Sequence, residues 1–169
     1  SWGLGELLKG KFDRMVITRP YVEAGEKLGF LPGDYGHKIA PFMIPIMQTL
    51  EDHISFQDIE DLTKENKIIT LPLAYMRGVT FKNAFVLLDE GQNTTITQMH
   101  LFLTRIGEKS KMVITGDKSQ SDIGSRNGFA DALNRLQGVV GSEIVELDPK
   151  LVVRHPIIQQ INERYDEKE

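Results

Sequence analysis

The stretch Ala84-Phe85-Val86-Leu87-Leu88-Asp89-Glu90 decides the fold. Its five consecutive apolar residues are typical of a strand buried on both faces, as in the middle of a parallel sheet. Two carboxylates follow at the point where that strand should end. Ligands of open α/β sheets bind beyond the carboxyl ends of the strands. Asp89 and Glu90 are therefore predicted to lie at a binding site.

A second run of residues repeats this design. Lys111-Met112-Val113-Ile114-Thr115 has the pattern of a strand, and Gly116-Asp117-Lys118-Ser119-Gln120 follows it. Two neighbouring parallel strands would bring Asp-Glu and Gly-Asp-x-x-Gln to one edge of a sheet. That combination predicts a nucleotide-hydrolysis site.

The rest of the chain alternates between strand and helix patterns. Five strands are predicted, at residues 14–18, 67–71, 84–88, 112–115 and 143–147, the last as a half-buried edge strand. Helices are predicted at residues 1–9, 37–50, 55–62, 95–107 and 122–138 and after Pro156, with capping residues at Ser55 and Thr95 and a kink or break at Pro45. This order predicts one α/β domain over residues 1–169, with a parallel sheet covered on both faces.

Composition narrows the function classes. The 169 residues are 40% hydrophobic and 26% charged, as in ordinary globular proteins. The absence of cysteine excludes disulfides, thiolate metal sites and a cysteine nucleophile. A net charge of −4 gives no general attraction to nucleic acid. No apolar run reaches the roughly 18–20 residues that span a bilayer, and no signal peptide opens the chain, so a cytoplasmic location is expected.

Phosphoryl transfer to water needs a metal, a group that orients the water and cations near the γ-phosphate. Asp89 suits the metal role, because a carboxylate at a strand end can hold Mg²⁺ directly or through water. Glu90 is the candidate for activating the attacking water, and Gln120 for sensing the γ-phosphate. Asp117 could join the metal shell or hold the second strand end, but it could also be a simple turn residue.

Several cations are candidates for contacts with phosphate. Arg154 could stabilise the transition state, although a surface or salt-bridge arginine is its plainer interpretation, and Arg105 is a weaker candidate. Thr18 and Arg19 at a strand end, with Arg77, could contact a nucleic-acid backbone, and a structural turn is the alternative.

Six stretches carry a resemblance to a known family. They are ITRPYVEAGEKLGFLPGD (17–34), AYMRG (74–78), LDEGQN (88–93), FLTRIG (102–107), TGDKSQ (115–120) and VRHP (153–156). In these stretches the chain resembles the PhoH-like ATPase family, whose core is similar to the superfamily 1 helicase domain. The resemblance covers nearly the whole chain, and its first stretch is the most specific.

The resemblance implies a fold and an activity. The fold is a three-layer RecA-like P-loop NTPase core with a mostly parallel sheet, and the activity is Mg²⁺-dependent ATP hydrolysis in the cytoplasm, with Asp89 and Glu90 as the Walker B pair. It also implies links to phosphate starvation, to RNA or single-stranded nucleic acid, and to ring-shaped homo-oligomers.

The chain departs from the family pattern in three places. Gly91 stands where the family usually has alanine, and Val79 where a basic residue is common. No segment matches the phosphate-binding loop G-x-x-x-x-G-K-[ST], so the sequence looks like a family domain that is incomplete at the N-terminus, cut just downstream of that loop. We therefore expect weak or undetectable ATP binding by this chain, and an open sheet edge that favours self-association.

Two other functions are compatible with the sequence. A metal-dependent nuclease could use Asp89, Glu90, Asp117 and Asp122 around two metal ions. A non-catalytic interaction module could instead pack the Met- and Phe-bearing segment 39–50 against neighbouring subunits.

Overall fold

A computed structural model describes the chain except for residues 21–34, 149–156, 159–160, 162–163 and 165–169. It divides into two units, residues 1–135 and 136–169. The first unit holds the elements α1 (Trp2–Leu8), β1 (Arg14–Thr18), α2 (Tyr35–Glu51), α3 (Phe56–Lys64), β2 (Ile68–Thr70), η1 (Leu73–Met76), β3 (Ala84–Leu88), η2 (Gly91–Asn93), α4 (Ile96–Leu103), β4 (Lys111–Ile114) and α5 (Gly128–Arg135).

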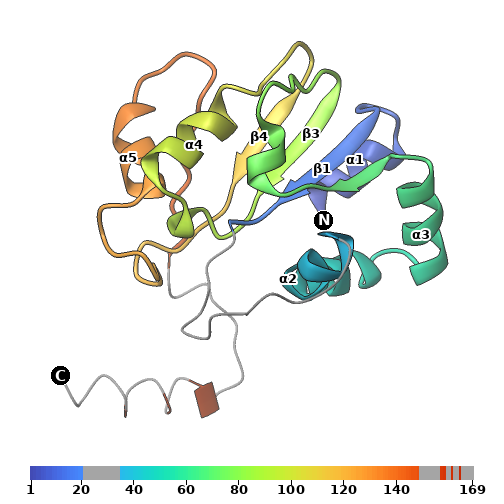
Figure 1. Cartoon of the computed structure of the whole chain (residues 1–169), viewed down its shortest axis with the longest axis horizontal. Helices are drawn as coiled ribbons and strands as arrows, with labels where there is room; N and C mark the ends of the chain where they lie inside the picture. The colour runs from blue at the N-terminus through green and yellow to red at the C-terminus, as the bar shows by residue number, and fades with distance from the viewer. Residues whose placement is uncertain (21–34, 149–156, 159–160, 162–163, 165–169) are drawn as a thin grey trace. The chain divides into compact units, whose positions relative to one another are not determined.

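The first unit is built on a parallel four-stranded sheet with the order β2-β1-β3-β4 (Figure 1). In its register Ile17 pairs with Leu87, and Leu87 pairs with Val113. All strands point the same way, so the carboxyl ends of β1, β3 and β4 meet at one edge. The stretch at residues 84–88 is a central strand, as predicted.

Helices cover both faces of this sheet, which gives the predicted α/β architecture of a RecA-like core. On one face Met15, Ile17 and Phe85 join a core cluster with side chains of α1, α2 and α3, namely Leu4, Leu7, Met43, Ile46, Leu50 and Ile59. Strand alternation turns Val16 and Val86 to the opposite face, where they are fully buried. There η1 and α5 pack against α4, whose Met99 and Phe102 are buried.

Two helix starts follow from local sequence. Ser55 accepts a hydrogen bond from the Asp58 amide while Asp58 bonds back to Ser55, which forms a complete capping box before α3. Thr95 and Gln98 form the same arrangement before α4. Both starts agree with the prediction.

Four sequence predictions differ from the structure. Residues 143–147 form no strand and are exposed, because an alternating pattern alone does not supply a partner strand. The helix expected over 122–138 begins at Gly128, and the one expected to stop at Gly107 ends at Leu103. Pro45 does not split α2, which runs unbroken from Tyr35 to Glu51.

The second unit contributes little regular structure. Its described residues 136–148 consist of turns and segments without regular secondary structure. Residues 157–158, 161 and 164 are helical, in line with the helix expected after Pro156. Among the described residues of both units, no helix combines the length and apolar character needed to cross a membrane.

Candidate functional site

The site is built where β1, β3 and β4 end. The Asp89 amide donates to the Thr18 carbonyl at 3.0 Å, and the Thr115 amide donates to the Leu88 carbonyl at 2.9 Å. These backbone bonds extend the parallel ladders by one residue past β3. The sheet therefore brings Asp89 between the last residue of β1 and the first residue after β4.

A single arginine bridges the two predicted Walker B carboxylates. Arg19 Nε lies 3.1 Å from Asp89 Oδ2, and Arg19 Nη2 lies 2.9 Å from Glu90 Oε1. The Thr115 hydroxyl donates to Asp89 Oδ1 at 2.7 Å. The side chains of Asp89 and Glu90 are 29% and 41% exposed, and that of Arg19 is 18% exposed, so the pair sits in a partly desolvated setting that strengthens its attraction.

Glu90 has an unusual backbone. Its φ of 55° and ψ of 42° lie in the left-handed region, which a residue with a side chain rarely adopts. The 3₁₀ helix η2 starts directly after it. Such outliers concentrate at functional sites, where the surrounding contacts hold them in place.

Gln92 joins Glu90 to the loop that follows β4. It is only 1% exposed, and its Nε2 donates to Glu90 Oε2 at 2.5 Å and to the Gln120 carbonyl at 3.4 Å. Its Oε1 accepts the Asp117 amide at 3.1 Å. Sequence reasoning assigned Gln92 no role, although it stands within the quoted stretch LDEGQN. A polar side chain directly after the carboxylate pair was the available signal.

The loop after β4 satisfies its own carboxylate. Asp117 Oδ1 accepts the amide and the hydroxyl of Ser119 at 2.8 and 2.6 Å. Asp117 Oδ2 accepts Gln120 Nε2 at 2.9 Å. This is the turn arrangement that the sequence left open for Asp117. The Gln120 side chain is thus directed to Asp117, and only its carbonyl joins the network around Glu90.

The other predicted site residues lie elsewhere. Arg105 lies at the opposite edge of the sheet, because its neighbour Ile106 pairs with Phe81 ahead of β3, and its guanidinium donates to Leu101 and Val79 carbonyls. Arg77 is exposed at the end of η1.

Thr18 and Arg154 complete the set of predicted residues. Thr18 is fully buried, and its hydroxyl has no hydrogen-bond partner among the described residues. Its side chain is therefore not available to a nucleic-acid backbone in this conformation. Arg154 lies outside the described residues.

The structure offers no support for the arrangement that a nuclease would need. Within the described residues, no group of three or more histidine, cysteine, aspartate or glutamate side chains is placed to hold a metal. Asp122, the fourth carboxylate of that hypothesis, instead accepts Asn93 Nδ2 at 2.9 Å. For the interaction module, Met43, Ile46 and Leu50 of α2 belong to the core, so they are not free to contact a neighbouring subunit.

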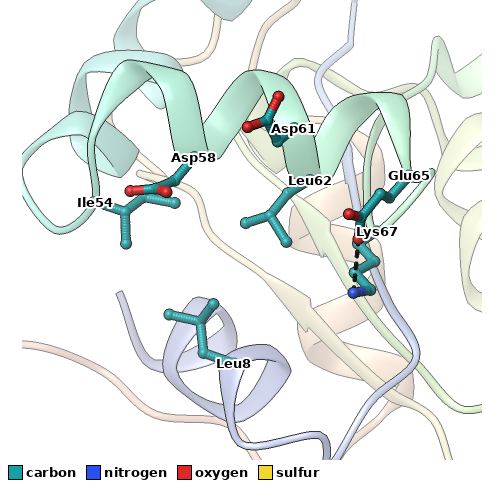
Figure 2. A pocket seen from close by; sticks show the side chains of 7 residues that line it. All are labelled: Leu8, Ile54, Asp58, Asp61, Leu62, Glu65 and Lys67. Carbon is teal, nitrogen blue, oxygen red and sulfur yellow. Dashed lines mark ion pairs between the residues drawn. The ribbon is translucent and has the colours of Figure 1, made fainter.

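A second acidic region lies away from this edge. Figure 2 shows a hollow between α1 and α3 lined by Leu8, Ile54, Asp58, Asp61, Leu62, Glu65 and Lys67. Its carboxylates have roles in local structure, since Asp58 caps α3 and Glu65 pairs with Lys67 at 2.7 Å.

Comparison with known proteins identifies the family of this chain. The sequence model of the family described as PhoH-like protein matches residues 1–166. The chain is 48% identical over 164 residues to a PhoH-like protein of Bacillus subtilis, which covers 96% of this chain and 51% of that protein. It is 47% identical over 165 residues to a PhoH-like protein of Synechocystis, which covers 96% of this chain and 50% of that protein.

A more distant relative extends the comparison. Protein PhoH of Escherichia coli K12 is 39% identical over 163 residues, which covers 94% of this chain and 46% of that protein. The chain thus spans about half the length of the curated relatives it matches. With a match over nearly all of its residues and a parallel sheet that carries the expected carboxylate pair, this chain belongs to the PhoH-like protein family.

Proposed function

We propose that this chain is part of the ATP-binding and ATP-hydrolysing core of a PhoH-like protein, dependent on Mg²⁺. One observation carries the proposal: the Asp89–Glu90 pair, bridged by Arg19 and bonded to Thr115, stands at the carboxyl edge of a parallel sheet. Sheets of this type bind phosphate ligands at that edge.

The side chains at the edge suit a hard divalent cation. Asp89 Oδ1 and the Thr115 hydroxyl lie 2.7 Å apart, and both are oxygen donors of the kind that Mg²⁺ prefers. The ion supplies charge stabilisation to the phosphates when it is bound. Arg19 must give up its contact with Asp89 Oδ2 for that oxygen to serve as well. We assign Arg19 the contact with a phosphate oxygen, as a cation at the same edge of the sheet.

Glu90 is the residue that we assign to the water. Its carboxylate is more exposed than that of Asp89 and carries donors from Arg19 and Gln92 that fix its direction. A carboxylate held in this way can accept the proton of an attacking water.

We also propose two kinds of partner, which rest on the family resemblance alone. They are RNA or other single-stranded nucleic acid, and further copies of the chain in a ring.

The test is a nuclear magnetic resonance titration, because it detects weak binding as well as tight binding and shows where on the chain the ligand lies. Mn²⁺ replaces Mg²⁺ in the presence of ATP, and broadening of amide signals marks the metal position. We expect broadening at Asp89, Glu90 and Thr115, and its loss in Asp89→Asn.

The matched control removes a carboxylate from the hollow of Figure 2. Asp61→Asn changes the same functional group on α3 and should leave the broadening at Asp89 intact. Release of inorganic phosphate from Mg·ATP by the unmodified chain, absent in Glu90→Ala, completes the test. Broadening that is equal in Asp89→Asn and the unmodified chain would overturn the proposal.

A further inference from the structure

Gln92 makes every hydrogen bond that its amide group can donate. An amide nitrogen has two protons, and here one goes to Glu90 Oε2 and the other to the Gln120 carbonyl. The amide oxygen accepts from the Asp117 backbone, and the Gln92 carbonyl accepts the Ser121 hydroxyl at 3.0 Å. One buried residue therefore connects the carboxylate after β3 with Asp117 and Gln120 of the loop after β4, and with Ser121 directly after it.

The neighbouring glycine leaves room for this amide. A Cβ atom at Gly116 would lie 2.9 Å from Gln92 Oε1, closer than such contacts occur in proteins. The amide oxygen is the end of a flexible side chain, so it would be the atom to move. The same Cβ would lie 3.2 Å from the Gln92 backbone nitrogen and 3.2 Å from Phe129 Cε1, so substitution at Gly116 presses first on the Gln92 amide and less closely on these two atoms.

The bond to Glu90 is not needed to satisfy a buried charge. With 41% of its side chain exposed, the Glu90 carboxylate can be solvated by water. The Gln92 bond instead fixes the orientation of the Glu90 carboxylate. Gln92 holds Oε2 on the side of β4, and Arg19 holds Oε1 on the side of β1. The left-handed backbone of Glu90 depends on contacts of this kind to persist.

We propose that Gln92 is a positioning residue that sets the direction of the Glu90 carboxylate and makes it depend on the loop at residues 116–120. This inference rests on the proposed function, in which Glu90 takes the proton of the attacking water. A movement of that loop, by a phosphate or by a bound partner, changes the direction of Glu90 through Gln92. The loop is then a control point for hydrolysis and not a contact for substrate alone.

The kinetic test compares Gln92→Met, which keeps the length but loses the hydrogen bonds, with Gly116→Ala. We expect each to lower kcat about 10²-fold with little change in KM, since misplacing a reacting group costs about that much. The added Cβ of Gly116→Ala comes closest to the Gln92 amide, so the effect of the double variant on kcat should be far smaller than the product of the two single effects. Gly5→Ala, where a Cβ meets nothing within 4 Å, is the control and should leave kcat unchanged. A kcat for Gln92→Met equal to the control, or effects of the two variants that multiply, would overturn the inference.

A second test does not require hydrolysis. Glu90→Ala should shift the amide signal of Asp117 in a nitrogen-15 spectrum, because Gln92 transmits the change, and the shift should vanish in a Gln92→Met background. An Asp117 response of equal size in both backgrounds would refute the coupling. This test also distinguishes failure of the proposed function from failure of this inference. No response of the chain to Mg·ATP would count against the proposed function, whereas the Asp117 signal would still show whether Gln92 couples Glu90 to the loop. If Gln92→Met does not fold, as seen by circular dichroism, Gly116→Ala provides the second background.

Discussion

The loops after β3 and β4 both follow an apolar strand and both carry aspartate near their start. Their carboxylates differ in how far away along the sequence their bonding partners lie. Asp89 and Glu90 are held by Arg19 from β1, and Asp89 also by Thr115 from β4. Asp117 is held by Ser119 and Gln120, two and three residues further on. The Asp89 and Glu90 carboxylates therefore depend on the assembled sheet, whereas the Asp117 carboxylate bonds within its own turn, and it is the backbone of that turn that Gln92 bonds to the loop after β3.

The difference between long-range and local partners indicates which carboxylates are available for chemistry. A side chain whose partners come from other strands changes its environment when a ligand displaces one of them. A side chain that completes a turn is needed where it stands, because its loss releases backbone donors. We therefore assign the metal and water roles to Asp89 and Glu90, and a structural role to Asp117.

The largest expected effect comes from removing the long-range cation. Arg19→Met leaves two neighbouring carboxylates without their shared partner, and we expect the free energy of unfolding to fall by about 2 kcal/mol. Urea unfolding measures the change. Arg14→Met, at the exposed start of the same strand, is the matched control and should have little effect. Equal losses in the two variants would mean that the Arg19 bridge adds no stability, and the comparison of the loops would fail.

A smaller effect is expected where the two loops approach each other. A Cβ atom at Gly91 would lie 2.7 Å from Ile114 Cγ2 and 3.1 Å from the Thr115 carbonyl. Gly91→Ala should therefore destabilise the chain by about 1–2 kcal/mol, the range for an overpacked site. Thermal unfolding with Gly5→Ala as control tests it. The resemblance to the family places alanine at this position in many members. An unchanged melting temperature would show that the Ile114 side chain moves to make room for the added Cβ, and that packing between the two loops is looser than these distances indicate.

The smallest effect is expected for the local carboxylate. Asp117→Ala removes side-chain bonds within one exposed turn, which should cost about 1 kcal/mol or less. Urea unfolding under the same conditions as for Arg19→Met gives a direct ranking. A loss larger than that of Arg19→Met would reverse the comparison and make the loop after β4 the main support of this edge.

The elements that could be predicted are those whose signals are local. The apolar runs at 84–88 and 111–114 are strands, and the Ser55 and Thr95 capping boxes start helices where expected. The start of α5 was missed because residues 122–127 continue the helical pattern. The signal was Asn127, whose Oδ1 accepts the Ala130 amide at 2.9 Å, as a helix N-cap does.

Local sequence patterns could not predict the contacts between side chains of the site. The sequence placed Asp89 and Glu90 at a strand end, and the structure agrees. It could not pair them with Arg19, because no single segment of the sequence indicates which strands lie next to each other in the sheet. The same holds for residues 143–147, where alternation predicted a strand that the structure does not form.

The strand order also bears on how the chain folds. Arg19 and Glu90 are 71 residues apart in sequence, and they meet only after β1 has paired with β3. Closing so long a loop costs entropy before any contact repays it, and parallel pairings of this kind form slowly. The Asp117 turn closes over three residues and can form early. We therefore expect the carboxylate pair to gain its native partners among the last events of folding, after the helices and turns around it have formed.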